Sequence, residues 1–317
     1  MLKSLVRRAT ALPLVAWLRN RRRSGVCSMD GHPATRATTF ASLIDGRRSW
    51  LFETLPREAA EYQYDIFKKS SQKRLARRLG IPVADEYLSR VPLVEAIAYV
   101  EQTRMERFVI KPNSSHSAIG TRCLVRGGDG RYLDLKSQRR RPLKKIAQEA
   151  RREYARLGRP DQWMLEELLL PADGSSSLLD DYKCSCFGGV VEVIAHKRPI
   201  PGTGRYDAAQ HFTRDWMPVN IGVDDRDELI YEAPRLGRKI IEVAEAAASG
   251  LSYPFIRIDL YDTTRGIVLG EFTPGPGRAD RLHPEWDERF TDLWQAAARR
   301  TAEDIRSGRS IPLGPES

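Results

Sequence analysis

The stretch FIRIDLYDTTRGIVLGEFTPGPG, residues 255–277, carries the strongest structural signal in this chain. Apolar and charged residues alternate with period two in its first part, so Arg257 and Asp259 share one face of a predicted strand and the isoleucines share the other. Residues 262–266 are rich in turn formers, and a second apolar β run follows over 267–272. The stretch therefore predicts a β-hairpin.

This hairpin sets two carboxylates against each other. A turn centred near residue 264 or 265 pairs positions whose numbers sum to about 529 or 530, which places Asp259 opposite Glu271. Cross-strand neighbours lie about 5 Å apart, where like charges are destabilising. A divalent metal, helped by Arg257, would resolve the conflict. A solvated hairpin edge with scattered charges is the alternative, and the hairpin alone does not decide between the two.

Composition favours a soluble globular protein. The chain has 317 residues, of which 41% are hydrophobic and 30% charged, enough for two domains or one large α/β enzyme. Its four cysteines are sparse, and the Cys184-Ser185-Cys186 spacing does not suit zinc, so we expect a reducing, cytoplasmic compartment. The net charge of +10 suits phosphate and carboxylate partners, but does not choose between nucleic acid, an anionic membrane and an acidic substrate.

The N-terminal segment is basic at both ends of a short apolar run. Residues 1–25 are expected to form a basic amphipathic helix, which either rests on the inner face of an anionic membrane or packs within the protein. The apolar run is too short to span a bilayer. Residues 24–56 show little periodicity, so 26–60 is read as a linker or small N-terminal subdomain.

The rest of the chain alternates helical and strand patterns. A helical pattern starts at Pro56 and stops at Gly80, a natural C-cap. Further helices are expected at 95–104, 142–157, 232–249 and 287–307, and strands at 108–111, 123–125, 182–187 and 190–195. Gly188-Gly189 predicts a tight hairpin turn between the last two strands.

A loop of small residues, 113–121, follows directly after Lys111. Such a loop offers many backbone N–H groups and little steric bulk, which is what a phosphate cradle requires. It does not end in the Gly-Lys-Ser/Thr of a Walker A loop, and taken by itself it favours an ordinary polar turn over a phosphate cradle.

The order of these motifs resembles the ATP-grasp superfamily. The motifs are a strand ending in Lys111-Pro112, the small-residue loop, the EELL segment that begins at Glu166, R-x-D at 257–259, and GEFTPGPG at 270–277. Within the superfamily the sequence is most similar to the amidoligase-like group associated with teichuronopeptide biosynthesis, through Asp181-Tyr182-Lys183, Cys186-Phe187-Gly188 and Asp215-Trp216. The resemblance spans roughly residues 60–295.

This resemblance implies an α+β protein with the ATP-grasp fold, in which two α+β subdomains with antiparallel sheets sandwich the nucleotide. The ATP-grasp domain would occupy 61–310, with a lid subdomain at about 108–165 and a metal-binding subdomain at about 175–295. The implied activity is ATP-dependent ligation of a carboxylate to an amine through an acyl phosphate, with release of ADP and phosphate. A cell-surface polymer or a peptide is the implied product class.

The resemblance also assigns a nucleotide site. Its residues would be Lys73, Lys111, Ser114, Ser115, Ser117, Gly120, Glu166, Glu167, Leu168 and Lys183. Lys111 would contact the phosphates, the loop from Ser114 to Gly120 would close over them, and Glu166 to Leu168 would hold adenine and ribose. Lys183 and Lys73 are looser matches to phosphate-facing lysines.

The catalytic and metal residues come from the hairpin. Asp259 and Glu271 match the acidic ligands of Mg²⁺, and Arg257 matches the arginine that, together with Lys111, stabilises the charge developing during acyl transfer. The superfamily usually has Asn where Thr273 stands here, and a hydroxyl is a poorer magnesium ligand than an amide oxygen.

A basic, proline-stiffened loop over 196–205 is expected to cover the site. Lys197, Arg198 or Arg205 would then bind a substrate carboxylate or the γ-phosphate, unless the loop is only an exposed connection. Two alternatives to a ligase remain open: a kinase on the same fold that phosphorylates a hydroxyl, and a non-catalytic basic protein that binds anionic lipid or nucleic acid. We expect small-molecule, peptide or polymer substrates rather than a nucleic acid partner.

Overall fold

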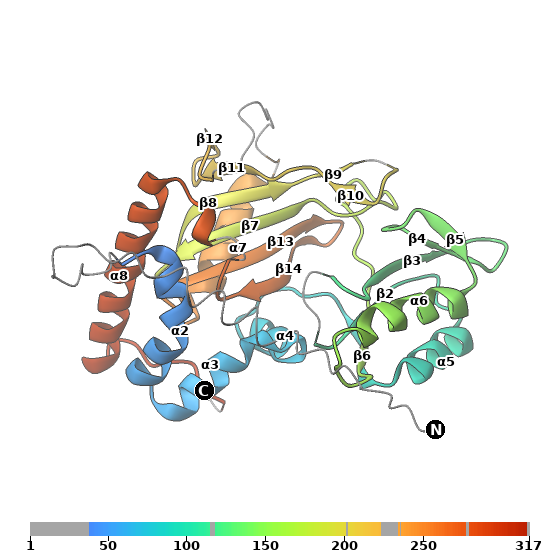
Figure 1. Cartoon of the computed structure of the whole chain (residues 1–317), viewed down its shortest axis with the longest axis horizontal. Helices are drawn as coiled ribbons and strands as arrows, with labels where there is room; N and C mark the ends of the chain where they lie inside the picture. Colours follow the sequence, from blue (N-terminus) through green and yellow to red (C-terminus); the bar gives the residue numbers. More distant parts are fainter. Residues whose placement is uncertain are drawn as a thin grey trace, which may run out of the picture. The chain divides into compact units, whose positions relative to one another are not determined.

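The computed structural model describes residues 38–114, 118–200, 202–222, 234, 236–276 and 279–315 (Figure 1). The predicted N-terminal helix, Cys27, Ser115 and Ser117 lie outside these residues. Residues Thr39–Ser317 group into one compact unit. Within the described ranges, no helix combines the length and apolar character needed to cross a bilayer.

The first sheet has six antiparallel strands in the order β1-β6-β2-β3-β4-β5. Its strands are β1 (Glu86–Val91), β2 (Arg107–Pro112), β3 (Arg122–Arg126), β4 (Tyr132–Asp134), β5 (Arg139–Arg141) and β6 (Trp163–Glu166). Helices α5 (Leu93–Thr103) and α6 (Leu143–Ala155) cover one face, where Phe108 and Ile110 of β2 are buried against them (Figure 1). Lys111 alternates with these residues and therefore lies on the opposite face.

The second sheet also has six strands, in the order β12-β11-β8-β7-β13-β14. They are β7 (Asp181–Phe187), β8 (Val190–Lys197), β11 (Gln210–Thr213), β12 (Pro218–Val219), β13 (Phe255–Thr263) and β14 (Gly266–Thr273). A small separate ribbon pairs β9 (Pro199–Ile200) with β10 (Arg205–Tyr206). Both glycines of the β7–β8 turn have positive φ, +53° at Gly188 and +89° at Gly189, which is the geometry of a type I′ hairpin and confirms the predicted turn.

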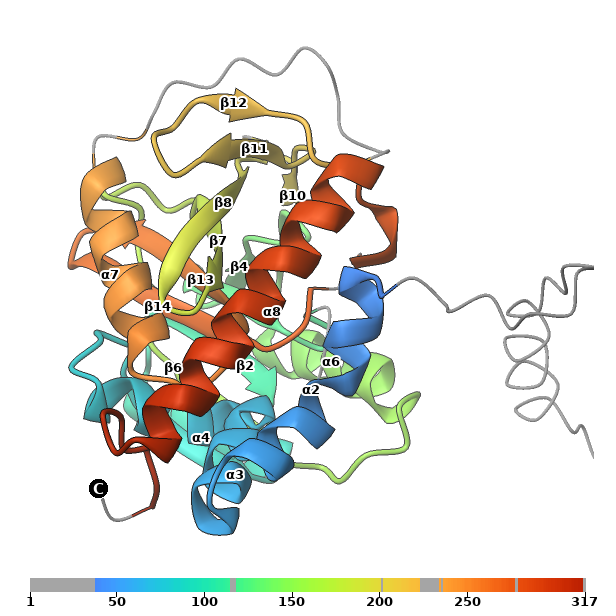
Figure 2. The ribbon, with the colours of Figure 1, turned by 90° about the vertical axis from the view of Figure 1, so that its left-hand side faces the viewer.

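Helices cover both faces of the second sheet (Figure 2). On one face, α7 (Gly237–Ser249) packs on the buried thiols of Cys184 and Cys186 and on the isoleucines of β13. On the other face, α2 (Phe40–Thr54) and α8 (Pro284–Arg306) cover only the end that carries Phe187 and Phe255. The remaining part of this face is where the charged residues of β7, β8 and β13 lie.

Helix α2 differs from the sequence prediction, which expected a loosely structured segment over 24–56. The helix starts with a capping box between Thr39 and Ser42. It is held by tertiary contacts: the Phe40 ring lies 5.2 Å from that of Phe255 and 5.3 Å from that of Phe290. Aromatic packing of this kind stabilises a helix whose own sequence is weakly amphipathic.

The predicted helix from Pro56 to Gly80 is broken into α3 (Arg57–Tyr64), the 3₁₀ turn η1 (Asp65–Phe67) and α4 (Lys69–Arg78). Gly80 has φ +68° and ends α4 as expected. The helices predicted at 95–104, 142–157 and 287–307 are confirmed as α5, α6 and α8. The short 3₁₀ turn η2 (Ala279–Arg281), β1, β4 and β5 had no prediction.

The two sheets meet beside the β13–β14 hairpin. Val83, just before β1, forms a parallel bridge with Leu269, and Pro171, after β6, pairs with Thr263. The chain segments that enter and leave the first sheet are thus bonded to the hairpin of the second.

Candidate active site

The predicted pairing of Asp259 with Glu271 is present in the β13–β14 ladder. Next to it the register shifts by one, so that Leu260 pairs with Leu269 and Gly270 is the extra residue. A Cβ on Gly270 would lie 2.6 Å from the Tyr261 ring, so glycine is required for this approach. The bulge therefore follows directly after the Asp259–Glu271 pair.

Asp259 is the centre of an ion cluster. Its carboxylate is 2% exposed and accepts hydrogen bonds from Arg257 Nε at 2.6 Å and Nη2 at 2.8 Å. Lys183 of β7 donates to it at 2.6 Å and also lies 2.7 Å from Asp181. Burial alone would lower the pKa of Lys183, but the two aspartates raise it. Burial raises the pKa of Asp181, whose Oδ1 is buried without a hydrogen-bond partner among the described residues.

Glu271 and Thr273 form the open edge of this cluster. The Thr273 hydroxyl donates to Glu271 at 3.1 Å and accepts from Arg257 at 3.1 Å. The Glu271 side chain is 48% exposed and lies 3.5 Å from Arg257. Arg257, Asp259, Glu271 and Thr273 are thus together, as predicted.

The side-chain oxygens of Asp259, Glu271 and Thr273 fit a magnesium ion. The described residues contain no group of three His, Cys, Asp or Glu side chains arranged for a metal. Mg²⁺ is usually held by one or two carboxylates together with substrate phosphates and water, which Asp259, Glu271 and the Thr273 hydroxyl can satisfy. Both Asp259 oxygens are engaged by cations, so a metal would share them with Lys183 and Arg257. The unpartnered oxygen of Asp181 in the same cluster also suits a cation.

The first sheet contributes a second ion cluster around Glu166. This carboxylate is buried and forms ion pairs with Lys111 of β2 and, at 2.5 Å, with Lys73 of α4. Lys73 also donates to the carbonyl of Ala84 at 3.0 Å. Burial alone would raise the pKa of Glu166, but the two ammonium groups lower it. The structure therefore joins Lys73, Lys111 and Glu166, and the Glu166 side chain orients lysines.

Lys69 was not predicted, yet it lies between the two clusters. Its ammonium donates to the Pro112 carbonyl at 3.5 Å. Burial and the charge of Lys111 lower its pKa to about 8, and both Glu166 and Glu271 act on it electrostatically. It stands one helical turn before Lys73 on α4, and this i, i+4 spacing is the sequence signal that would have identified it.

The predicted phosphate loop and the predicted adenine-binding segment both contact other parts of the protein. The Ser114 hydroxyl is 3.0 Å from that of Tyr154 on α6. Gly120 has φ +74°, and a Cβ there would lie 3.0 Å from the Pro112 ring. Glu167 accepts from the backbone N–H of Asp85 at 3.1 Å and pairs with Arg265. Leu168 follows the end of β6 and is half-buried.

The basic loop over 196–205 contains the β9–β10 ribbon. Lys197 of β8 pairs in register with Asp181, and burial together with Lys183 lowers its pKa. A Cβ on Gly204 would lie 1.9 Å from the Lys136 carbonyl oxygen, so the ribbon lies directly against the first sheet. Arg205 is exposed and is not brought into the Asp259 cluster. Arg198 is exposed, and its charge acts electrostatically on Tyr182, which belongs to the core under α7.

Comparisons with known proteins found one family and several solved structures that are similar to this chain. Residues 54–295 match the family described as "TupA-like ATPgrasp". Similar solved structures include D-alanine–D-alanine ligase from Bacillus anthracis (16% identity, 81% of this chain and 72% of that chain covered, TM-score 0.46) and D-alanyl-alanine synthetase A from Vibrio cholerae (16%, 79% and 68%, 0.47). D-cycloserine synthetase DcsG is similar at 17% identity, with 78% and 73% covered and a TM-score of 0.44. No curated protein sequence matches the chain.

Proposed function

The chain belongs to the TupA-like ATP-grasp family, and on this premise we propose that it is an ATP-dependent ligase that joins a carboxylate to an amine. A substrate carboxylate oxygen attacks the γ-phosphorus of ATP, and ADP leaves as an acyl phosphate forms. The amine then attacks the acyl carbon, loses a proton and expels inorganic phosphate, which leaves an amide. The observation that carries this proposal is the position of Lys69, within electrostatic reach of Lys111 and Glu166 on one sheet and Glu271 on the other.

The cations around this position account for the chemistry. Phosphoryl transfer needs positioning and charge stabilisation more than covalent participation. Lys111 and Lys69 would bind the phosphate chain from the first sheet and α4, while Lys183 and Arg257 would bind it and the developing oxyanion from the second. Cys184 and Cys186 have pKa values raised by burial under α7, so their thiols stay protonated and are structural residues.

Asp259 and Glu271, with the Thr273 hydroxyl, would hold Mg²⁺. When bound, the ion would neutralise negative charge on the phosphate groups of ATP. Lys183 and Arg257 orient Asp259 for this role, because Arg257 donates to both of its carboxylate oxygens and Lys183 donates to one of them.

We expect the full chain to bind ATP with magnesium in a calorimetric titration. With the correct acid and amine, ADP and free phosphate should appear together with an amide detected by mass spectrometry. Hydroxylamine should divert the acyl phosphate to a hydroxamate when only the acid is present. A product that retains the phosphate would identify a kinase instead. Absence of nucleotide binding would contradict both enzymes and favour salt-sensitive binding of anionic lipid or nucleic acid.

Nucleotide affinity should fall as pH rises above about 8. The free protein has Lys69 with a pKa of about 8, and phosphate oxygens beside it would raise that pKa. The complex then holds more protons than the free protein, so affinity drops by about fivefold from pH 8 to 9. Calorimetry in buffers of different ionisation enthalpy measures this proton uptake. Lys69→Arg, which stays charged, should bind with little pH dependence, and an unchanged pH profile in this variant would contradict the role of Lys69.

The wider role follows the resemblance to the teichuronopeptide-associated group. We propose that the product is a cell-surface polymer or a peptide, made on the cytoplasmic side of the membrane. Residues 1–23 would contact the anionic membrane surface. This segment lies outside the described residues, so the proposal rests on its sequence alone.

A further inference from the structure

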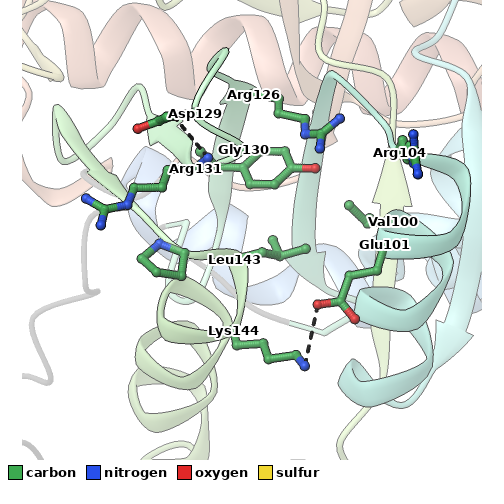
Figure 3. Close-up of a pocket in the computed structure, with 11 residues that line it drawn as sticks. Val100, Glu101, Arg104, Arg126, Asp129, Gly130, Arg131, Leu143 and Lys144 are labelled. Carbon is green, nitrogen blue, oxygen red and sulfur yellow. Dashed lines mark hydrogen bonds and ion pairs between the residues drawn. The ribbon is translucent and has the colours of Figure 1, made fainter.

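A cavity of about 390 Å³ lies between the end of α5, the turn that joins β3 to β4, and the start of α6 (Figure 3). Its apolar wall is formed by Val100, Tyr132 and Leu143, which belong to the core beneath α5 and α6. Lys111 points from the opposite face of the same sheet. The cavity is therefore separate from the proposed nucleotide site, and its volume is within the range of small-ligand pockets.

Cationic side chains from three segments surround this cavity: Arg104, Arg126, Arg131 and Lys144. Its two carboxylates are already engaged. Glu101 lies 3.7 Å from Lys144 (Figure 3). Asp129 accepts from the backbone N–H of Arg131 at 3.1 Å and lies 3.8 Å from Arg140. The cavity has an excess of positive charge.

Arg104, Arg126 and Arg131 form no ion pair with any described residue. A single exposed arginine needs no ligand, because water solvates it. Here the guanidinium groups of Arg104 and Arg126 point toward the same side of the cavity (Figure 3). An anion on that side of the cavity could accept charge-assisted hydrogen bonds from these guanidinium groups.

The backbone at Arg104 fixes one side of the cavity. This residue ends α5 in the left-handed conformation, with φ 52° and ψ 40°, which is unfavourable for a residue other than glycine. The Tyr132 hydroxyl donates to the carbonyl of the next residue, Met105, at 2.9 Å and holds the turn against the sheet. The C-terminal end of α5 itself attracts a cation, which explains Arg104 but neither Arg126 nor Arg131.

The net charge of the first sheet and its helices also favours an anionic ligand. Residues 86–166 contain 17 Lys and Arg against 10 Asp and Glu, a net +7 out of +10 for the chain. Such a field raises the local concentration of anions. We propose that the cavity is a second anion site, which binds the phosphate or carboxylate group of a small ligand.

The test is an NMR titration of the full chain with inorganic phosphate in one arm and glutarate in the other. The nucleotide site is kept saturated with magnesium and a non-hydrolysable ATP analogue. Backbone amide signals of residues 126–131 and 143–145 should shift and saturate. The arm with the tighter binding identifies the oxyanion.

The variant Arg104→Gly with Arg126→Ala should bind at least about tenfold more weakly, because charge-assisted hydrogen bonds are lost. Glycine favours the left-handed backbone at 104, so folding should not suffer. The control, Arg107→Ala with Arg152→Ala, removes the same charge from exposed positions that do not line the cavity. Absence of saturable shifts in both arms, or equal losses in both double variants, would overturn the proposal.

Discussion

Glu271→Gln is expected to lower the rate of ADP formation by about a thousandfold, because it removes an anionic magnesium ligand and a partner of Arg257. The Glu271 side chain is 48% exposed. Its replacement should therefore change the free energy of unfolding by no more than about 0.5 kcal/mol. A coupled ADP assay and a denaturant titration measure the two quantities.

Glu242→Gln is the matched control. Glu242 is also 48% exposed and also pairs with an arginine, Arg238, at 3.0 Å, but it lies on α7. Its loss should leave the rate unchanged. Equal rates for the two variants would remove Glu271 from the active site.

Asp259→Asn tests the same site with a different signature. Asp259 is buried between Lys183 and Arg257, so its neutralisation removes the carboxylate that these two buried cations share. We expect this variant to lose both turnover and stability, which makes Glu271 the cleaner probe of chemistry.

The hairpin was predictable from the sequence because it is determined by residues that lie close together along the chain. Alternation, a turn and a second apolar run gave the pairing of Asp259 with Glu271, and the bulge at Gly270 realises both registers that the turn allowed. The small-residue turn between β7 and β8 was predictable for the same reason.

Features that depend on contacts distant in sequence were not predictable. Helix α2 is stabilised by rings from β7, β13 and α8, none of which a local pattern in residues 40–54 can report. The role of the Glu166 side chain is set by lysines from α4 and β2, 93 and 55 positions earlier, as the numbers of Lys73 and Lys111 show. Sequence likeness placed Glu166 beside the nucleotide but did not show that it holds two lysines.

Glu166→Gln is expected to destabilise the protein by about 3–5 kcal/mol at neutral pH, because it leaves two ammonium groups without a carboxylate. Lys73 is only 11% exposed and Lys111 only 17%, so water cannot replace the lost charge. For a unit of this size we expect a fall in Tm of about 5–9 °C. Thermal unfolding followed by circular dichroism measures it.

Glu167→Gln, at the adjacent position, is the control for this loss. Glu167 is 22% exposed and its partner Arg265 is 42% exposed, so their ion pair should contribute less than about 1 kcal/mol to stability.

The pKa of Glu166 is lowered in the folded state. Its contribution to stability is therefore present above the ordinary glutamate pKa and is lost as pH falls through the pKa of the folded state. The difference in free energy of unfolding between wild type and Glu166→Gln should therefore be largest at pH 7 and should disappear in acid. Binding of ATP should also reduce this difference in free energy of unfolding, because phosphate oxygens would supply the missing negative charge to Lys73 and Lys111. Similar unfolding temperatures for the two variants would show that Glu166 does not hold these lysines.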